Sequence, residues 1–341
     1  MNDGNMLILT GEEVLSLLMG REVELIQVIE KAYMAHGSGN SSLPHSSFLR
    51  FPDDPGNRII ALPAYLGEEF DLAGIKWIAS FPANIDKGLD RASGILILSS
   101  ARTGRPEAIL EASIISAKRT AASAVLATRT LQGEHAANSV GLIGCGAINF
   151  EIARFMLATL PSIRRFILFD LSARHSAQFK ERCNQLIASV EVDIADNIET
   201  VFKNCLLISF ATNAARPHVN DVSSCIAGST ILHVSLRDLA PEVILSCDNI
   251  VDDVDHACRA QTSIHLTEQL VGNRDFIRCL LSDALSGRAP GRASEQKIAV
   301  FSPFGLGLLD VAVGKFTVEL ARKNKVGTVI NSFLPKPWSR N

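Results

Sequence analysis

The stretch Val140-Gly-Leu-Ile-Gly-Cys-Gly-Ala-Ile-Asn149 decides the fold. Its first four residues predict a buried strand, glycines follow at Gly144 and Gly146, and Phe150-Glu-Ile-Ala-Arg-Phe-Met156 is typical of a helix. A strand, a glycine-rich turn and a helix in this order are the context that a dinucleotide fingerprint requires. Gly144 permits the tight turn, and Gly146 lets backbone N–H groups approach a pyrophosphate at the helix N-terminus. We therefore predict a Rossmann-type unit.

Asp170 extends this prediction to the choice of cofactor. It ends the next predicted strand, where an acidic side chain accepts hydrogen bonds from the adenosine ribose. A carboxylate there repels a 2′-phosphate, which favours NAD over NADP. The alternative is a strand-end aspartate that caps the helix beginning at Ser172. Asn149 replaces the third glycine, so the fingerprint is imperfect. The predicted cofactor-binding residues are Gly144, Gly146, Ala147, Ile148, Asp170 and Thr212.

Strands and helices alternate through the centre of the chain. Apolar strands are expected at 140–143, 166–169, 190–192, 206–210, 230–234 and 250–251. Strands this apolar are buried on both faces, as in a doubly wound parallel sheet. Before them, helical spacing at 11–38 precedes short β-rich runs from 47 to 112 and an Ala- and Leu-rich helix at 113–131, and another helix is expected at 309–323. The fold class is α/β, with a Rossmann doubly wound parallel sheet and a second α/β domain.

Length and composition exclude several classes of protein. A chain of 341 residues favours two domains over one. A hydrophobic fraction of 47% with 20% charged residues excludes disordered, collagen-like and coiled-coil chains. The net charge is -3 and no long basic run occurs, so we expect neither nucleic acid nor a membrane surface as partner. Small-molecule chemistry is the remaining expectation.

Cysteine and histidine patterns give no sign of disulfides or metal. The 7 cysteines are irregularly spaced without a CxxC pair, and the 8 histidines include no HxH or HExxH. We therefore expect reduced thiols and no metal site. The start of the sequence lacks a signal-peptide pattern and no apolar run is long enough to span a membrane, so a cytoplasmic location is expected by elimination.

Three charged residues in apolar or strand-end settings are candidates for chemistry. Lys76 lies in the apolar run Gly74-Ile-Lys-Trp-Ile78, where burial would lower its pKa and suit it to proton transfer. Arg119 lies in a small-residue helix, and its guanidinium could hold a carboxylate bidentately. Asp238 follows a predicted sheet strand, where ligands of doubly wound sheets bind. The alternatives are a lysine that snorkels from a sheet edge, a solvated arginine and a turn-capping aspartate.

Motifs spread over nearly the whole chain resemble the ornithine cyclodeaminase/μ-crystallin family. They are Gly74-Ile-Lys76 with Pro82-x-Asn84, Lys118-Arg-Thr-Ala-Ala122, Gly144-Cys-Gly146, Pro290-Gly-Arg292, and Phe301-Ser-Pro-Phe-Gly305 with Asp310. The resemblance implies a substrate-binding and dimerisation domain formed by residues 1–120 and 303–341. It implies an NAD-binding Rossmann domain at 121–302 between them. Residues 47–112 also contain few helices of their own, so a homodimer is expected to cover the exposed face of their sheet.

Within the family, three segments favour one activity. Arg91-Ala-Ser-Gly-Ile-Leu-Ile-Leu98, Glu111-Ala-Ser-Ile-Ile-Ser116 and Val251-Asp-Asp253 are most similar to members that oxidise N-(2-amino-2-carboxyethyl)-L-glutamate with NAD. Hydrolysis of the imine then gives L-2,3-diaminopropionate and 2-oxoglutarate, for siderophore or peptide antibiotic biosynthesis. Ornithine cyclodeaminases usually carry Gly-Leu-Pro-x-His where this chain has Asp90-Arg-Ala-Ser93. They usually carry Asp-Gly-Thr where this chain has Glu111-Ala-Ser113. These differences weaken the interpretation as a cyclodeaminase.

The resemblance also implies a role for each candidate. Lys76 and Asp238 are the predicted catalytic residues, which move protons on the amine and the attacking water. Arg50 and Arg119 would hold the α-carboxylate, and Arg91 with Ser93 an additional carboxylate. Taken alone, Arg50 and Arg91 have weaker cases, because an arginine in a short strand or loop is usually a surface residue. Two other functions stay open: an ornithine cyclodeaminase, and a non-catalytic protein that binds NAD(P)H and a ligand.

Overall fold

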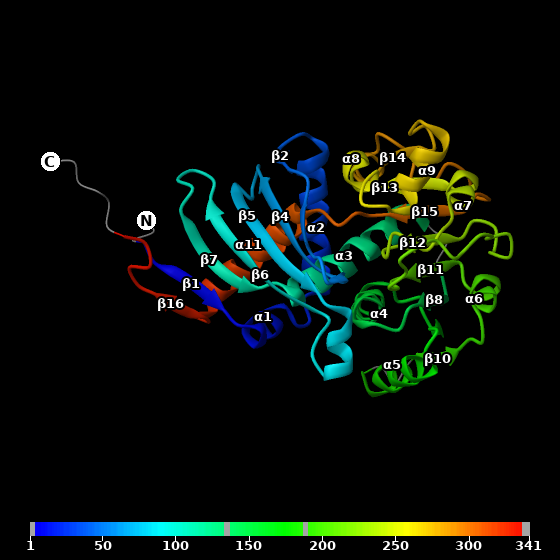
Figure 1. Ribbon diagram of the computed structural model, residues 1–341, viewed down its shortest axis with the longest axis horizontal. Helices are drawn as coiled ribbons and strands as arrows, with labels where there is room; N and C mark the ends of the chain where they lie inside the picture. Colours follow the sequence, from blue (N-terminus) through cyan, green and yellow to red (C-terminus); the bar gives the residue numbers. More distant parts are fainter. Residues whose placement is uncertain (1–3, 133–136, 187–189, 336–341) are drawn as a thin grey trace. The chain divides into compact units, whose positions relative to one another are not determined.

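The computed structural model describes residues 4–132, 137–186 and 190–335. These form two compact units, Met1–Arg119 with Leu306–Asn341, here the outer unit, and Thr120–Gly305, the central unit. Helix α3 (Ser113–Gln132) contains one boundary between the units, and the other follows Gly305 (Figure 1). The chain thus leaves the outer unit within a helix and returns to it through a glycine.

The outer unit is built on a mixed sheet with the strand order β16-β1-β7-β6-β5-β4-β2, and β3 also pairs with β4. Strands β1 and β7 are parallel and the other pairs are antiparallel. The strands are β1 (Met6–Leu9), β2 (Ser41–Ser42), β3 (Ser47–Phe51), β4 (Asp54–Leu66), β5 (Leu72–Ser80), β6 (Ala92–Ser100), β7 (Pro106–Glu111) and β16 (Thr328–Ile330). A 3-10 helix, η1 (Pro82–Lys87), joins β5 to β6.

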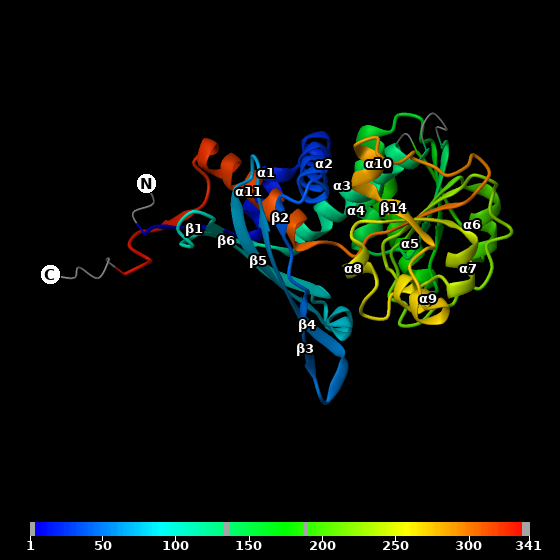
Figure 2. The ribbon, with the colours of Figure 1, turned by 90° about the horizontal axis from the view of Figure 1, so that it is seen from above.

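Three helices, α1 (Gly11–Leu18), α2 (Glu22–Gly37) and α11 (Gly307–Asn324), cover one face of this sheet (Figure 2). The helical spacing predicted at 11–38 corresponds to two helices: α1 ends at Leu18, Met19 is extended, and Gly20 turns the chain with a φ of +72°. The opposite sheet face carries exposed apolar side chains. Leu49, Trp77 and Ile95 are each at least 41% exposed there.

The central unit contains an entirely parallel sheet with the order β10-β9-β8-β11-β12-β15-β13-β14. The strands are β8 (Ser139–Ile143), β9 (Arg165–Phe169), β10 (Glu191–Ile194), β11 (Leu207–Phe210), β12 (Thr230–His233), β13 (Asp248–Val251), β14 (Ile277–Leu280) and β15 (Ala299–Ser302). The helices are α4 (Ala147–Thr159), α5 (Ala173–Leu186), α6 (Ile198–Asn204), α7 (Pro241–Ser246), α8 (Val254–Ala257), α9 (Ser263–Val271) and α10 (Leu281–Leu285). Strands β8, β11, β12, β13 and β15 are almost completely buried, which confirms the predicted α/β class with its doubly wound sheet.

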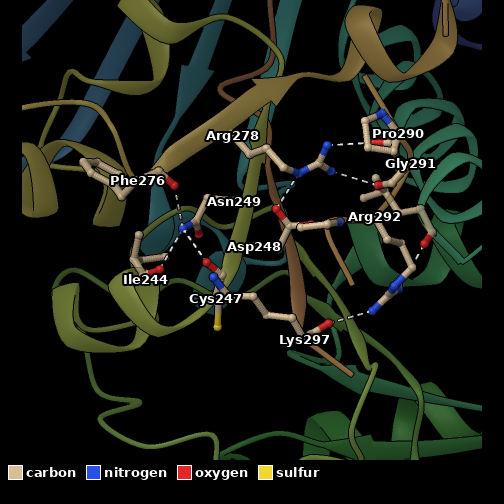
Figure 3. Close-up of polar contacts among 12 residues, drawn as sticks. Ile244, Cys247, Asp248, Asn249, Phe276, Arg278, Pro290, Gly291, Arg292 and Lys297 are labelled. Carbon is tan, nitrogen blue, oxygen red and sulfur yellow. Dashed lines mark hydrogen bonds and ion pairs between the residues drawn. The ribbon is translucent and has the colours of Figure 1, made fainter. Parts of the chain in front are cut away.

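The motif Pro290-Gly-Arg292 ties a long loop to this sheet (Figure 3). Arg292 donates to main-chain oxygens of Leu131, Gly228 and Lys297 at 2.7–3.0 Å and to the Thr230 hydroxyl at 2.9 Å. Nearby, Arg278 pairs with Asp248 at 2.6 Å and donates to the carbonyls of Pro290 and Gly291. The loop's arginine therefore stabilises the fold, because its donors satisfy backbone oxygens that burial would otherwise leave unpaired.

The remaining sequence expectations concern cysteines, membranes and metals. All 7 cysteines are free thiols. Within the described ranges, no helix has the length and hydropathy needed to cross a bilayer. Those same residues contain no group of three or more His, Cys, Asp or Glu side chains placed to hold a metal ion.

Candidate active site

A buried charge cluster in the outer unit joins Lys76 to the helix α11. Lys76 Nζ donates to Asp310 Oδ2 at 2.7 Å and to the Ser116 hydroxyl at 3.1 Å. Arg119 Nε lies 3.4 Å from the other carboxylate oxygen, and its Nη2 donates to Ser116 at 3.4 Å. The side chains of Lys76 and Asp310 are 2% and 0% exposed. Two cations therefore share one buried carboxylate, which leaves the cluster with a net positive charge.

Burial lowers the pKa of Lys76 to about 8, against the charge of Asp310, which raises it. The Arg119 charge lowers the Lys76 pKa further, and the hydrogen bond to Asp310 raises it. An amine with this pKa exchanges protons readily near neutral pH, which is the property expected of a general base or acid. The alternative of a lysine that snorkels from a sheet edge is wrong, since Nζ is enclosed.

Strand register explains why Lys76 points into the protein. On β5, Lys76 pairs with Leu62 of β4 and Leu96 of β6, so all three side chains lie on the face that α11 covers. Sequence reasoning assigned no role to Asp310 or Ser116. A carboxylate inside the apolar run Gly307–Val313 was the available signal for Asp310, because such a group requires a buried cationic partner.

A second group of cations lies along the same face of the outer unit's sheet. Arg50 on β3 pairs with Arg58 on β4, which pairs with Ser80 on β5. Arg91 Nε donates to the Ser80 hydroxyl at 3.3 Å. Among the described residues, Arg50, Arg58 and Arg91 form no ion pair with a carboxylate. The buried Nε of Arg58 has no hydrogen-bond partner.

The three guanidinium groups of this second group influence one another. Burial lowers the pKa of Arg58 and of Arg91. The charge of Arg50 lowers the Arg58 pKa further, and the charge of Arg58 does the same for Arg91. Arg58 was missed in the sequence, because one arginine in a short strand is usually a surface residue. An anion would relieve this repulsion.

Ser93 lies away from this arginine group. It pairs with Ala79, so its side chain belongs to the sheet face of Trp77 and Ile95. Of the predicted substrate-binding residues, Arg50 and Arg91 therefore lie in one group, connected through Arg58 and Ser80. Arg119 lies with Lys76 in the other group, beside Asp310. It does not bring Ser93 to either group.

In the central unit, the turn after β8 has the geometry of a phosphate-binding loop. Gly144 has φ +91°, and a Cβ there would lie 2.5 Å from the Ala211 carbonyl oxygen, so only glycine fits. A Cβ on Gly146 would meet no heavy atom within 4 Å. Gly146 is the N-cap of α4 and has no side-chain cap, while Ala147 and Ile148 begin the helix with unpaired N–H groups. The open space at Gly146 leaves room for a ligand against the helix N-terminus.

Asp170 holds this turn in place. Its carboxylate accepts hydrogen bonds from the backbone N–H of Cys145 and of Ser172, both at 2.8 Å. The hydrogen bond from Ser172 shows that Asp170 also caps the start of the following helix, as the alternative interpretation expected. Asn149, at the third glycine position, is completely buried and donates to the carbonyls of Ile143 and Gly144 at 2.9 and 2.8 Å. The substitution of that glycine therefore links α4 to the end of β8.

Asp238 is the centre of a buried polar network in the central unit. Its side chain is 0% exposed, and the hydroxyls of Thr212 and Ser235 both donate to it. His218 Nε2 lies 3.1 Å from one carboxylate oxygen and His233 Nε2 lies 3.3 Å from the other. Thr212, predicted to bind the cofactor, thus contacts Asp238. The two histidines and Ser235 were missed, since nothing in their spacing indicates a shared partner.

Neighbouring side chains keep Asp238 ionised. Burial raises the pKa of Asp238, but hydrogen bonds and charge from His233, with the hydroxyls of Ser235 and Thr212, hold it well below its usual range. A hydrogen bond from His233 to this carboxylate uses a proton on Nε2. The same nitrogen also lies 3.1 Å from the backbone N–H of Asp238, and its Nδ1 lies 3.2 Å from the Ser302 hydroxyl. A proton on Nδ1 would instead leave Nε2 to accept from that N–H.

Comparison with known proteins decides the family. The sequence profile of the ornithine cyclodeaminase/mu-crystallin family matches residues 5–325. The chain belongs to this family. N-((2S)-2-amino-2-carboxyethyl)-L-glutamate dehydrogenase of Staphylococcus aureus is 28% identical over 314 residues, which cover 90% of this chain and 93% of that protein.

Solved structures of the family support the fold. An archaeal alanine dehydrogenase dimer with bound NAD is 26% identical with a TM-score of 0.82, covering 96% of this chain and 99% of that one. Delta(1)-pyrroline-2-carboxylate reductase of Thermococcus litoralis, in complex with NADH and L-proline, is 23% identical with a TM-score of 0.87. It covers 95% of this chain and 99% of its own. The family match over residues 5–325 confirms the predicted family, and these structures confirm the fold class.

Proposed function

We propose that this chain is an NAD-dependent dehydrogenase that oxidises N-(2-amino-2-carboxyethyl)-L-glutamate. Conjugate, NAD and water would give 2-oxoglutarate, L-2,3-diaminopropionate, NADH and a proton. The S. aureus relative named for this substrate supports the proposal, although relatives with other substrates are equally similar in sequence, such as an alanine dehydrogenase at 28% identity. Sequence similarity therefore does not choose the substrate, and the charges on the outer unit's sheet favour one candidate.

The observation that carries the proposal is the pair of cationic groups on one face of the outer unit's sheet. Lys76 and Ser80 lie four residues apart on β5, about 13 Å at about 3.3 Å per residue. At the first of these positions, Lys76 and Arg119 both lie beside Asp310. At the second, Arg58 is the strand partner of Ser80, and Arg91 donates to the Ser80 hydroxyl. A substrate with carboxylates at both ends fits this arrangement. The distal ammonium of ornithine would be repelled by the arginine group.

Each cation has an assigned role in this proposal. Asp310 and Ser116 engage two of the three nitrogens of Arg119, and we assign the third to the α-carboxylate of the glutamate portion. Arg50, Arg58 and Arg91 would bind a second carboxylate of the substrate. Its negative charge would offset the repulsion among the three guanidinium groups. Ser93, on the other sheet face, is a weaker candidate and stays a prediction.

NAD is the cofactor, and the turn after β8 fits it. The open space at Gly146, the free N–H groups that begin α4 and the carboxylate of Asp170 match a pyrophosphate and a ribose in chemistry. When bound, NAD accepts the hydride from the glutamate-derived Cα. Gly144, Gly146, Ala147 and Ile148 would face the pyrophosphate. Among the residues predicted to bind NAD, Thr212 has the weakest support, because its hydroxyl donates a hydrogen bond to Asp238.

Proton transfer is assigned to Lys76 and Asp238. Neutral Lys76, available because its pKa is about 8, would accept the proton of the substrate amine before hydride leaves. The Asp238 carboxylate, ionised at neutral pH, would accept a proton from the water that attacks the imine. Lys76 would then return its proton to the substrate nitrogen and the C–N bond would break. The hydroxyl proton would pass to the released amine of diaminopropionate, and the oxygen of the water would become the keto oxygen of 2-oxoglutarate.

One assay separates this function from the other two. The protein is incubated with NAD and either the conjugate or ornithine. Net NADH with released 2-oxoglutarate supports the dehydrogenase. Proline and ammonia without net NADH would indicate an ornithine cyclodeaminase, and saturable binding without products a ligand-binding protein. Fold and family alone do not choose among these outcomes.

A homodimer and a cytoplasmic location remain proposals. In the described part of the outer unit, the helices α1, α2 and α11 pack on the opposite face of the sheet from Leu49, Trp77 and Ile95, and a second copy could bury those side chains. Sedimentation at micromolar concentration tests this: a dimer supports the proposal and a monomer contradicts it.

A further inference from the structure

A proton accepted by Asp238 must leave a fully enclosed carboxylate. Its polar side-chain neighbours are Thr212, Ser235, His233 and His218. The two hydroxyls already donate to the carboxylate, and His233 is 0% exposed with its second nitrogen at Ser302. The side chain of His218 is 42% exposed. It therefore connects the buried oxygen with solvent.

Main-chain contacts fix His218 beside Asp238. The N–H groups of His218 and Val219 both donate to the Asp238 carbonyl at 2.9 Å. Val219 and Leu239 form a parallel bridge, and Ala240 N donates back to the Val219 carbonyl at 2.9 Å. These contacts hold the main chain of His218 beside Asp238, and from that position its Nε2 lies 3.1 Å from Oδ1.

We propose that His218 is the proton relay of Asp238, a positioning residue that acts through this carboxylate. The inference rests on the proposed function, in which each turnover releases one proton. Protonated Asp238 would pass its proton to Nε2 of the neutral ring, and the resulting imidazolium would release its Nδ1 proton to water. Rotation of this partly exposed ring, with proton exchange with water, would then restore the starting tautomer. The carboxylate is then ready for the next water molecule. An imidazole suits this task, since it gains a proton at one nitrogen as it loses one at the other.

The test compares His218→Gln with wild type in NADH formation from the conjugate. Glutamine keeps hydrogen-bonding capacity but cannot carry a proton. We expect kcat to fall tenfold to about a hundredfold, the lower end of the range for acid–base groups, with little change in the KM for NAD. Added imidazole should restore the rate of His218→Gln in a saturable manner and leave wild type unchanged. His265→Gln, which removes a histidine on α9, is the control and should keep wild-type kcat.

The kcat of His218→Gln and its response to imidazole decide whether His218 is a relay. Undiminished kcat in His218→Gln overturns the relay. A loss that imidazole does not restore also overturns it and leaves His218 with a structural role, which a lowered melting temperature would document. Wild-type protein that forms no NADH from the conjugate contradicts the proposed function itself, and the relay with it. Wild-type turnover with an unaffected variant contradicts the relay alone.

Discussion

Lys76 Nζ and Asp310 Oδ2 lie 2.7 Å apart although the two residues are 234 positions apart in the sequence. Strand β5 supplies the amine and helix α11 supplies the carboxylate, so the pair joins the N-terminal and C-terminal segments of the outer unit. Such a pair is costly to bury unless both partners are present. Arg119 lies beside this pair, so the pKa of Lys76 responds to two charges of opposite sign. The charge of Asp310 raises this pKa and the charge of Arg119 lowers it.

The pH dependence of turnover should respond to those two charges in opposite directions. If neutral Lys76 is the base, kcat/KM should rise with pH through a midpoint near 8. Asp310→Asn removes the charge that raises the Lys76 pKa, so its midpoint should move to lower pH. Arg119→Gln removes a charge that lowers that pKa, so its midpoint should move to higher pH. Midpoints that shift in the same direction, measured by initial rates from pH 6 to 10, would contradict this assignment.

Loss of either proton-transfer group should slow turnover without releasing the cofactor. We expect Lys76→Met and Asp238→Asn each to lower kcat by about a hundredfold or more. The NAD dissociation constant, measured by fluorescence titration, should change little. Near-normal kcat with a raised KM would move that residue from catalysis to binding.

Two glycines of the turn after β8 should behave differently when replaced by alanine. Gly146 has φ -101° and free space around its Cβ position, so Gly146→Ala should fold with an unchanged melting temperature. Its methyl group would occupy the space assigned to the pyrophosphate, so NAD affinity should fall at least about tenfold. Gly144→Ala should instead destabilise the fold by more than about 1 kcal/mol, because of its positive φ and the nearby Ala211 oxygen. Unchanged NAD affinity in Gly146→Ala would contradict the cofactor site.

The arginine group should determine selectivity for the polycarboxylate. A charged bidentate contact contributes about 1.5 to 3 kcal/mol, or about 10 to 150-fold. Arg91→Ala and Arg58→Ala should each lower kcat/KM for the conjugate by about this factor, and by much less for an analogue that lacks one carboxylate. Arg102→Ala, at an exposed turn, is the matched control. Equal losses on both substrates would refute a role in recognition.

Arg292 should matter for stability and not for chemistry. Arg292→Lys keeps the charge but cannot reproduce the forked contacts to Leu131, Gly228 and Lys297. We expect a loss of at least about 2 kcal/mol in urea denaturation, with kcat retained by the folded fraction. Arg182→Ala, on an exposed position of α5, should stay within about 0.5 kcal/mol of wild type. A large fall in kcat without destabilisation would assign Arg292 to the site.

Sequence patterns predicted the central unit well, because its apolar strands and glycine turn are local features. The helical spacing at 11–38 did not show the break between α1 and α2, where Met19 is extended and Gly20 has a positive φ. Short strands such as β2 and β16 had no recognisable pattern, since their pairing depends on distant partners. For a similar reason, Asp310 could be noticed as an unusual residue but not paired with Lys76.

Other members of the candidate site depend entirely on tertiary contacts. Arg58 joins Arg50 and Arg91 through strand register, which the sequence does not state. His218 meets Asp238 because two chain segments are joined by a backbone bridge. The predicted roles of Lys76 and Asp238 stay predictions, although the structure gives each the buried, polar surroundings that such roles require.

The central claim is that hydride leaves the glutamate-derived Cα of the conjugate. Conjugate deuterated at this carbon is incubated with NAD, and the NADH, 2-oxoglutarate and diaminopropionate formed are quantified by mass spectrometry. We predict one deuterium in the reduced cofactor for each molecule of 2-oxoglutarate released, and none in diaminopropionate. Deuterium retained in the carbon products, or 2-oxoglutarate released without reduced cofactor, would contradict the account.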